Sequence, residues 1–428
     1  MSQYLKQKIF LMRYFFLLLI TSCSIGLSFG QIDQPSLGAG YSNFTFYALN
    51  DMSQTAYSHN DWDIAFSTDA FGAGIFVNEG VGLSFTGQLP VTELYLTESS
   101  DFDNVDTSNM VRIYNQEITW EEGAFNHVKD DNNPSDYGWG DYDFTTHVIS
   151  GTRLFVIHLK NGDYKKLFIE SLSSSLYTFK YANLDGSDLV TETIDKSSFD
   201  TKNLVYYSFE EQSILDLEPE NWDMLFTRYT TPLDNPSGGV IEYTVTGVLT
   251  NKDVLVAQAD GIDPDAVDAA DYEDEMGPEI ETIGWDWKEY TGAWTIAANR
   301  VYFLKNSEGL WKIQFLDFEG SSTGTATINK TFLGSVVNMD EIITFDQELI
   351  AYPNPAQEYV NIALELPSAV EQAKMSIINS AGQAIANLPV SFEAGLNVKQ
   401  IKIDYPAGLY QVIIYFDNTV ISKSILKR

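Results

Sequence analysis

A duplicated phrase constrains this chain of 428 residues more than any other feature. The stretch HNDWDIAF at 59–66 returns as NWDMLF at 221–226, and Trp62 lies 160 residues before Trp222. The same offset relates FTFYAL to LVYYSF and SFTG to TVTG. Order, spacing and residue type agree, so an internal duplication explains the pattern better than chance does.

The similarity continues downstream. RLFVIHLKNGDYKKLFI at 153–169 parallels RVYFLKNSEGLWKIQFL at 300–316, and YGWGDYDF at 137–144 parallels IGWDWKEY at 283–290. Two long copies predict a tandem pair of domains rather than a solenoid. We predict domains at residues 31–195 and 196–335, followed by a linker at 336–348.

The local chemistry of each copy is that of β-strands. Residues 153–172 predict two strands around an Asn-Gly-Asp turn, and helical periodicity is scarce. The run LFVIHL is apolar on both alternations, so this strand is expected to be central and covered on both faces. Trp62 and Trp222 are expected to bury their rings, while Asp63 and Asp223 accept backbone hydrogen bonds at a strand entry.

The last part of the chain, residues 349–428, has a different texture. It opens with ELIAYPNPAQEYVNIAL and continues in short alternating runs, and GLYQVIIYFDNTVISKSILKR predicts two strands joined across Asp-Asn. We therefore expect a small β-sandwich with a basic tail. The predicted fold class of the whole chain is all-β: two tandem domains followed by this sandwich.

Residues 1–30 predict a secretory signal peptide. A basic start is followed by the apolar run YFFLLLI and by small residues that lead to SFG. The apolar run is too short for a lasting membrane anchor, so no transmembrane segment is expected after processing. Cleavage near Gly30 is favoured, with a lipidated Cys23 as the alternative, and Cys23 is the only cysteine. A domain outside the cell would then depend on its core rather than on disulfides.

The charge is strongly acidic, with 60 Asp and Glu residues against 25 Lys and Arg residues. Such a field repels nucleic acid, which is therefore not expected as a partner. Eight acidic residues crowd the loop at 260–277, but their spacing matches no calcium loop. A solvated surface loop is favoured there, and calcium is an unlikely cofactor.

The end of the chain resembles the type A sorting domain of the type IX secretion system. YPNPA, AGLYQVII and the terminal KSILKR carry the resemblance, which covers residues 349–428. It implies export across an outer membrane by the type IX machinery, after which the protein is attached to the cell surface or released. The residues that match the sorting motifs are Tyr352, Pro353, Asn354, Pro355, Gly408 and Tyr410.

The middle of the chain resembles the HmuY-like family of surface haem-binding proteins. WDIAF, the strand ending FTG, and the long hairpin with its Asn-Gly-Asp turn carry this resemblance over residues 40–190, and residues 200–332 fit it more loosely. The family implies a β-rich fold, haem held by two axial side chains, and iron capture without catalysis. An outer-membrane haem receptor would then be a partner.

All four histidines lie in the first copy, so a bis-histidine haem site is expected only there. His127 is the favoured haem-binding residue because it lies in a long aromatic and acidic loop, and His147 is the second choice. His147 parallels Trp294 and is otherwise expected to be a packing residue. His59 is expected to be a solvated loop residue, and His158 to occupy a polar position.

Enzyme signatures are missing, since the chain has no Gly-x-Ser-x-Gly elbow, no His-Glu-x-x-His pair and no phosphate-binding loop. We expect a binding protein rather than an enzyme, with a glycan-active enzyme as the residual possibility. The alternative to haem binding is an adhesin or glycan-binding module on the same fold. Aromatic residues in YGWGDY and IGWDWKEY would serve that role, although Trp139 and Trp285 are first expected to be buried plugs.

Overall fold

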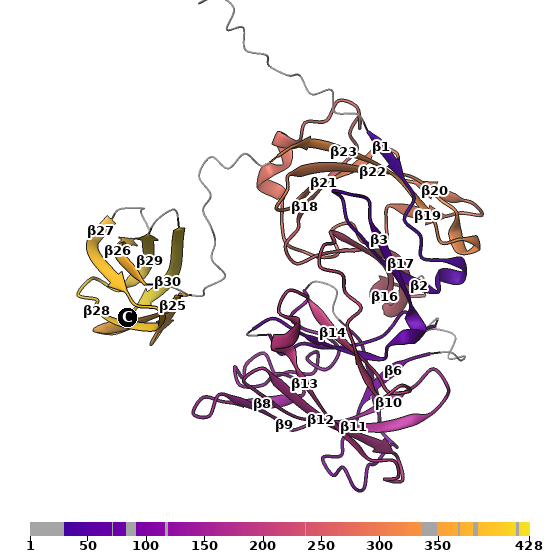
Figure 1. The fold of residues 1–428 in the computed structure, drawn as a ribbon, viewed down its shortest axis with the longest axis horizontal. Coiled ribbons are helices and arrows are strands. Elements are labelled where there is room, and N and C mark those ends of the chain that lie inside the picture. The colour runs from indigo at the N-terminus through magenta and orange to yellow at the C-terminus, as the bar shows by residue number, and fades with distance from the viewer. Residues whose placement is uncertain are drawn as a thin grey trace, which may run out of the picture. The chain divides into compact units, whose positions relative to one another are not determined.

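The computed structural model describes the chain from residue 30 onward, in the ranges 30–70, 72–82, 91–115, 119–235, 237–335, 349–366, 369–379, 384–416 and 419–428. Residues 1–29 of the predicted signal peptide lie outside the described residues. These residues fall into two compact units, 30–335 and 349–428, and almost all regular structure is β (Figure 1). The all-β prediction is confirmed. The short 3-10 helices are η1 (Ala39–Tyr41), η2 (His59–Asp61), η3 (Lys196–Phe199), η4 (Ala269–Glu275) and η5 (Gly320–Ser322).

The first copy builds one large antiparallel sheet around the predicted hairpin at 153–169. Leu154, Phe155, Val156 and Ile157 are all fully buried in a central strand, as their apolar run predicts. The strands in spatial order are β13 (Val190–Asp195), β12 (Leu176–Asn183), β11 (Tyr164–Ser173), β10 (Leu154–His158), β6 (Glu93–Leu96) and β7 (Val111–Ile113), and β9 (Val148–Gly151) joins β11 to β8 (Gly140–Asp143).

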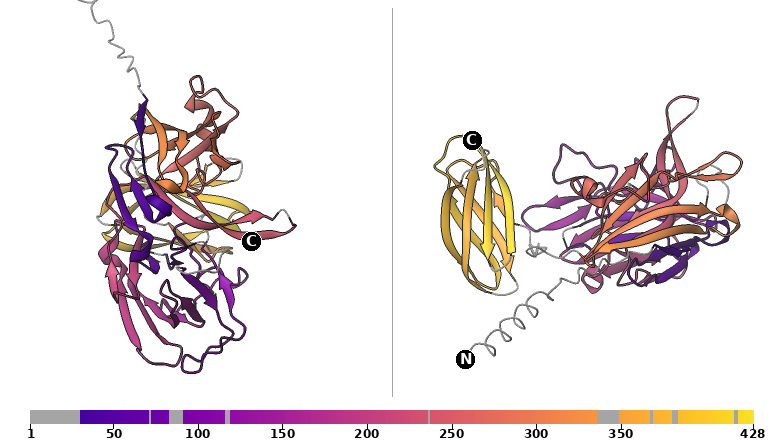
Figure 2. Two further views of the ribbon diagram at one scale, coloured as in Figure 1. Left: turned by 90° about the vertical axis from the view of Figure 1, so that its right-hand side faces the viewer. Right: turned by 90° about the horizontal axis from the view of Figure 1, so that it is seen from above.

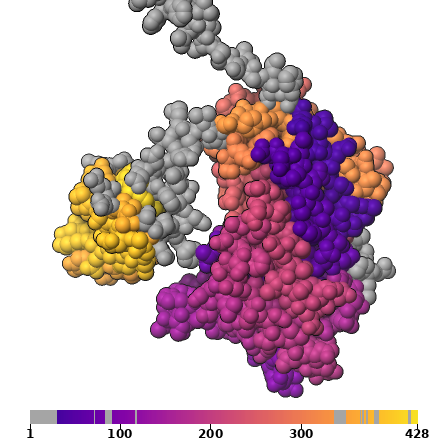
Figure 3. Space-filling view, in the orientation of Figure 1, coloured from indigo at the N-terminus to yellow at the C-terminus, as the bar shows by residue number. Residues whose placement is uncertain are grey.

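The second copy repeats the hairpin in its own sheet, but the edge strand comes from the start of the described chain. Gln31 pairs with Lys330, so β1 extends the sheet of the second copy. Figure 3 shows the indigo N-terminal residues lying along the orange second copy. The strands in spatial order are β1 (Gln31–Asp33), β23 (Ala326–Gly334), β22 (Leu310–Phe318), β21 (Arg300–Lys305) and β18 (Leu255–Asp260).

Two smaller sheets join the copies by strand exchange. Each tryptophan-led strand pairs with the strand FTFY or LVYY of the other copy rather than with its own. One sheet has the order β17 (Val240–Thr250), β16 (Met224–Asp234), β2 (Asn43–Tyr47) and β3 (Gln54–Ser58). The other has the order β15 (Ser213–Leu215), β14 (Leu204–Ser208), β4 (Ile64–Ser67) and β5 (Ile75–Val77). In Figure 1, β2 and β3 lie beside β16 and β17.

The exchange is symmetric in register. Tyr47 pairs with Met224, and at the offset of 160 residues Tyr207 pairs with Ile64.

The aspartates at the two strand entries, Asp63 and Asp223, accept backbone hydrogen bonds as predicted. The Asp63 carboxylate accepts the Phe209 amide at 2.8 Å, and the Asp223 carboxylate accepts the Leu49 amide at 2.6 Å. Both acceptors cap a strand of the opposite copy, so the aspartates help to hold the copies together.

The exchanged strands are buried on both faces. In β14, Leu204 and Tyr206 face a central core, whereas Val205 and Tyr207 face the core of the first copy. In β2, Phe44 and Phe46 face the same central core, whereas Tyr47 faces the core of the second copy. The ring of Trp222 is buried and that of Trp62 is partly buried in this central core. The domain division at 195/196 stays a prediction, and residues 30–335 form a single compact unit.

The second unit consists of two sheets around one hydrophobic core. The predicted pairing of the last two strands is present: Gly408 pairs with Lys427 at one end and Phe416 with Thr419 at the other. No helix in the described part of the chain is long and apolar enough to span a membrane. One sheet contains β24 (Ile350–Tyr352), β25 (Tyr359–Leu366) and β28 (Gly395–Lys402). The other contains β27 (Ala384–Phe392), β26 (Val370–Asn379), β29 (Gly408–Phe416) and β30 (Thr419–Lys427).

Candidate functional site

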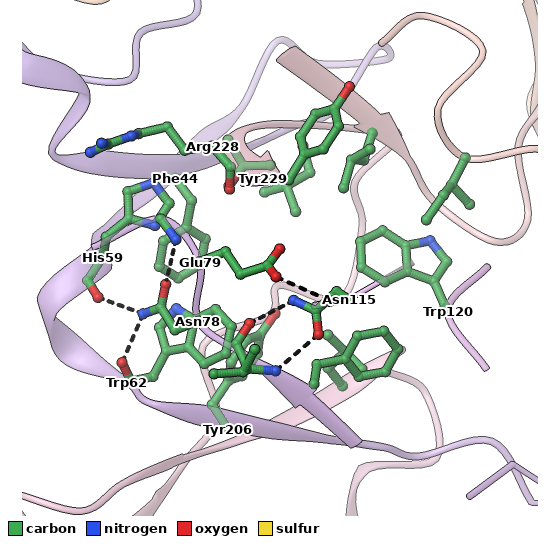
Figure 4. Close-up of a pocket in the computed structure, with 18 of the residues that line it drawn as sticks. Phe44, His59, Trp62, Asn78, Glu79, Asn115, Trp120, Tyr206, Arg228 and Tyr229 are labelled. Atoms are coloured by element: carbon green, nitrogen blue, oxygen red, sulfur yellow. Dashed lines mark hydrogen bonds between the residues drawn. The ribbon is translucent and has the colours of Figure 1, made fainter. Parts of the chain in front are cut away.

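The strand exchange encloses a small cavity of about 80 Å³, which we call the central cavity (Figure 4). Rings from both copies form its walls, since Phe44 and Trp62 come from the first copy and Tyr206 from the second. Polar side chains reach it as well. They are His59, Asn78, Glu79, Asn115 and Arg228.

His59 is buried in this cavity, so the expectation of a solvated loop residue is wrong. It begins η2, where Ser58 and Asp61 cap the turn, and only 3% of its surface is exposed. Within the described residues, neither ring nitrogen makes a hydrogen bond of normal geometry. Burial, helped by the positive charge of Arg228, lowers the pKa of His59 to about 3. Gly80 lies against the ring, and an added Cβ there would fall 2.0 Å from Nδ1.

Glu79 is the buried acid of the central cavity. Its carboxylate accepts the amides of Asn115 at 3.0 Å and Thr230 at 3.2 Å, which ties the first copy to β16. Burial outweighs these bonds and raises the pKa of Glu79 to about 7. Beside it, the Asn78 side chain donates to the carbonyls of His59 and Trp62, as Figure 4 shows.

A larger and more open cavity of about 570 Å³ lies between two hairpins of the second copy, and we call it the aromatic cleft. One wall is the hairpin β16–β17, which projects from its sheet in the left view of Figure 2. The other wall includes the hairpin of β19 (Lys288–Tyr290) and β20 (Trp294–Ile296). The aromatic side chains that line it are Tyr41, Tyr243, Trp285, Tyr290 and Trp294.

Lys288 supports the floor of the aromatic cleft. Its Nζ lies 4.2 Å from the ring centroid of Trp287 and 5.0 Å from that of Phe318, and it donates to the Thr246 carbonyl at 2.5 Å. Burial lowers the pKa of Lys288 to about 7. Trp294 packs edge-on against Phe318 at 5.0 Å, so the rings of the cleft are held by a packed layer beneath them.

Arg228 lines both cavities. Its side chain is buried, with 9% exposed, and its Nη2 donates to the Gly82 carbonyl at 2.7 Å. Burial lowers the pKa of this guanidinium. Two acids also line the cleft. Asp286 is ion-paired with Arg300 at 2.8 Å, and Glu289 is exposed.

The predicted haem residues lie elsewhere, and neither lines the central cavity or the aromatic cleft. His127 is exposed in a turn that follows Phe125. His147 is exposed in the β8–β9 turn with a positive φ of 58°, and its Nδ1 lies 2.6 Å from the Tyr142 hydroxyl, so it is not the packing residue that the repeat suggested. Nothing in the described geometry places the two histidines around one site.

The remaining candidates from the sequence, His158, Trp139 and Trp285, lie outside the central cavity, and the first two make packing contacts. His158 stacks on Tyr164 with 4.2 Å between centroids, and its Nδ1 lies 3.2 Å from the Glu93 carboxylate. Trp139 is a buried plug, but its structural counterpart is the buried Trp287, because both precede the first strand of the corresponding hairpin. Trp285 lines the aromatic cleft instead.

The acidic loop at 260–277 packs over the second sheet. Lys312 donates to the Pro264 carbonyl at 2.7 Å, and the loop contains η4. Within the described residues, no group of three or more His, Cys, Asp or Glu side chains is placed to hold a metal ion.

The predicted sorting motifs meet in the second unit. The Asn354 side chain accepts the Leu426 amide at 2.8 Å and donates to the Ser424 carbonyl at 3.1 Å, so it fastens the terminal strand β30. Gly408 begins β29, the strand that pairs with β30, and the buried Tyr410 donates from its hydroxyl to the Pro406 carbonyl at 2.7 Å. Motifs at both ends of this unit therefore form one structural element. The peptide bonds before Pro353 and Pro355 are cis.

Comparison with known proteins supports this element and little else. Residues 350–428 match the family described as the secretion system C-terminal sorting domain. No curated protein matches the chain. Among solved structures, it is similar to dimeric latent PorU from Porphyromonas gingivalis, with 8% identity, coverage of 92% of this chain and a TM-score of 0.16. The chain spans 34% of that protein's length, and so weak a likeness carries no argument.

Two findings agree on the end of the chain, namely the family match and the motif residues that fasten β30. The expectation of a type IX sorting domain is confirmed there, whereas no comparison supports the HmuY-like resemblance. Residues 350–428 are a secretion system C-terminal sorting domain, and the chain is a protein that the type IX secretion system exports to the cell surface or outside.

Proposed function

We propose that this protein is a surface binding protein that holds carbohydrate in the aromatic cleft. The observation that carries the proposal is the cleft itself, an open cavity of about 570 Å³ lined by five aromatic side chains and by several polar ones. Ligand sites are concave, mostly apolar and furnished with a few polar groups, and aromatic faces suit the apolar faces of sugar rings. The function is binding without catalysis.

Tyr290 offers the sharpest test because it lies in the cleft and is 63% exposed, so its removal disturbs no core. Tyr290→Ala in the full chain is expected to weaken glycan binding by roughly tenfold, since one aromatic contact is worth up to about 1.5 kcal/mol. A glycan array followed by calorimetric titration of the glycans that bind would measure this loss.

The first copy supplies a matched control. Phe144 is 65% exposed in the turn of the corresponding hairpin, β8–β9, so Phe144→Ala removes a comparable exposed ring away from the cleft. The Phe144→Ala variant should bind the glycan with the same affinity as the unaltered protein. The proposal fails if the array shows no bound glycan, or if both substitutions weaken binding equally.

Haem binding by a HmuY-like first copy is the second candidate, and it stays a prediction. It is supported by the sequence resemblance and by the presence of all four histidines in this copy, with exposed side chains at His127 and His147. If haem binds there, haemin should give a shifted Soret band that disappears in the double variant His127→Ala, His147→Ala. A spectrum that His127→Ala and His147→Ala leave unchanged would exclude these two residues as axial ligands.

A further inference from the structure

Arg228 differs from the other arginines described in residues 30–335. Arg112, Arg153 and Arg300 each form an ion pair with a carboxylate, at 2.6 or 2.7 Å. Arg228 is buried, yet it has no ion pair among the described residues. Its one hydrogen bond there goes to the Gly82 carbonyl. This is unexpected in a chain with 60 acidic residues.

A buried charge without a partner is destabilising, because it loses its hydration without gaining a counter-charge. Burial lowers the pKa of Arg228, and the Tyr41 side chain is the neighbour that acts in the opposite direction. Tyr41 lines the aromatic cleft, so the cleft side of Arg228 is where a counter-charge could approach. The other side faces His59 in the central cavity (Figure 4), and the pKa of His59, lowered to about 3, keeps that ring neutral.

The other charged side chains of the cleft leave Arg228 without a counter-charge. Lys288, whose pKa burial lowers to about 7, is a second basic side chain in the lining, and it donates to the Thr246 and Trp285 carbonyls. Of the two acids in the lining, Asp286 shares the Arg300 guanidinium with Asp260, and Glu289 is exposed to solvent. Arg228 is therefore the buried cation at the cleft that no described carboxylate pairs with, in a chain that as a whole is strongly negative.

We propose that the aromatic cleft selects sugars that carry a negatively charged group, and that Arg228 binds this group while Tyr290 and Trp294 contact the sugar ring. A guanidinium presents two parallel N–H donors to a carboxylate, sulfate or phosphate, so it recognises the shape of the group as well as its charge. This inference rests on the proposed carbohydrate-binding function and names the class of sugar.

The experiment is a glycan array with the full chain, followed by titration with trigalacturonic acid, with galactotriose as its neutral counterpart and with inorganic phosphate. Acidic glycans should be enriched among those bound, and trigalacturonic acid should bind at least tenfold more tightly than galactotriose. Inorganic phosphate should bind more weakly than trigalacturonic acid. If phosphate binds as tightly as trigalacturonic acid, the cleft is a site for free anions, and the proposal that it recognises an acidic sugar is overturned.

Arg228→Gln removes the charge and keeps a donor for the Gly82 carbonyl. It is expected to weaken binding of the acidic trisaccharide about tenfold and to leave binding of neutral glycans unchanged, since a charge-assisted hydrogen bond is lost. Arg228→Lys, which keeps the charge without the planar fork, should retain part of the affinity. Because the buried charge without a bound anion is destabilising, Arg228→Gln should not lower the melting temperature of the protein. If Arg228 had only a structural role, the same substitution would lower the melting temperature.

The outcomes separate the two proposals. If the array shows only neutral glycans, or if Arg228→Gln weakens neutral and acidic glycans alike, the selection of acidic sugars is wrong and carbohydrate binding stands. If no glycan binds, carbohydrate binding fails and the selection of acidic sugars fails with it.

Discussion

Three buried titratable side chains of the central region respond to pH in opposite directions. Burial raises the pKa of Glu79 and that of Glu218 to about 7, above an unfolded value near 4.5. Between pH 4.5 and 7 the folded protein therefore binds more protons than the unfolded chain, and stability falls as pH rises. His59 acts in reverse, because its pKa is lowered to about 3, so its contribution is lost as pH falls below about 6.5.

Glu79→Gln should remove one of these terms. As pH rises from 5 to 7, ionisation of the buried Glu79 carboxyl is expected to lower the free energy of unfolding by roughly 2 kcal/mol. The Glu79→Gln variant should lack this part of the decline. Urea unfolding at both pH values measures the difference. The exposed Glu211→Gln is the control and should leave the pH dependence unchanged. An identical decline in Glu79→Gln would show that Glu79 ionises in the folded protein as it does in the unfolded chain.

Residue identities alone were misleading at His59 and uninformative at Arg228. His59 stands in the polar run HND and parallels Pro219, which favours a loop, but η2 turns its ring into the central core. Arg228 lies between Thr227 and Tyr229 in β16 and gave no signal, because its lack of an ion pair depends on which carboxylates lie nearby in the folded protein. Histidine chemistry directed attention to His127 and His147, which are exposed instead.

At the scale of elements, the strand exchange is the main feature that the repeat did not reveal. Alternation and apolar content predict which residues form a strand, and both copies contain the expected strands at the expected offset. They do not specify which strand pairs with which, because the partner of β2 is decided by residues far away in the sequence. Closure of the central core from both copies selects the exchanged pairing, in which Phe44, Phe46, Leu204 and Tyr206 meet.

The exchange predicts that neither copy folds alone. A fragment of residues 31–195 lacks β14 and β16, the partners of β4 and β2, and would expose the central core. We expect it to unfold without a cooperative transition, while a fragment of residues 31–335 unfolds cooperatively, as measured by circular dichroism during heating. Mixing residues 31–195 with residues 196–335 should restore the transition.

The opposite result would also be informative. A cooperative transition in the 31–195 fragment alone, at the temperature of the longer fragment, would contradict a stabilising role for the exchanged strands and would support the predicted domain boundary. A transition that appears only in the mixture would assign the stability to the contacts between the copies.

For the whole molecule, the destination is clearer than the ligand. The sorting domain is recognisable from short motifs, and these motifs meet in one structural element, in which Asn354 fastens the terminal strand. The proposed binding surface, the aromatic cleft, has no such motif. Its parts come from residues 41, 228, 243 and 285–294, which become neighbours only after the hairpins have packed.

The amino-acid sequence by itself determined the β-strand content, the duplication and the sorting domain, because local periodicity, a constant offset between repeated phrases and short contiguous motifs can be read directly from the chain. Only the tertiary structure decided how the copies exchange strands, that His59 and Glu79 are buried between them, and that Arg228 borders the aromatic cleft without an ion pair. The physical reason is that pairing, burial and counter-charge depend on residues far apart in the sequence, and no local pattern specifies which of them will meet.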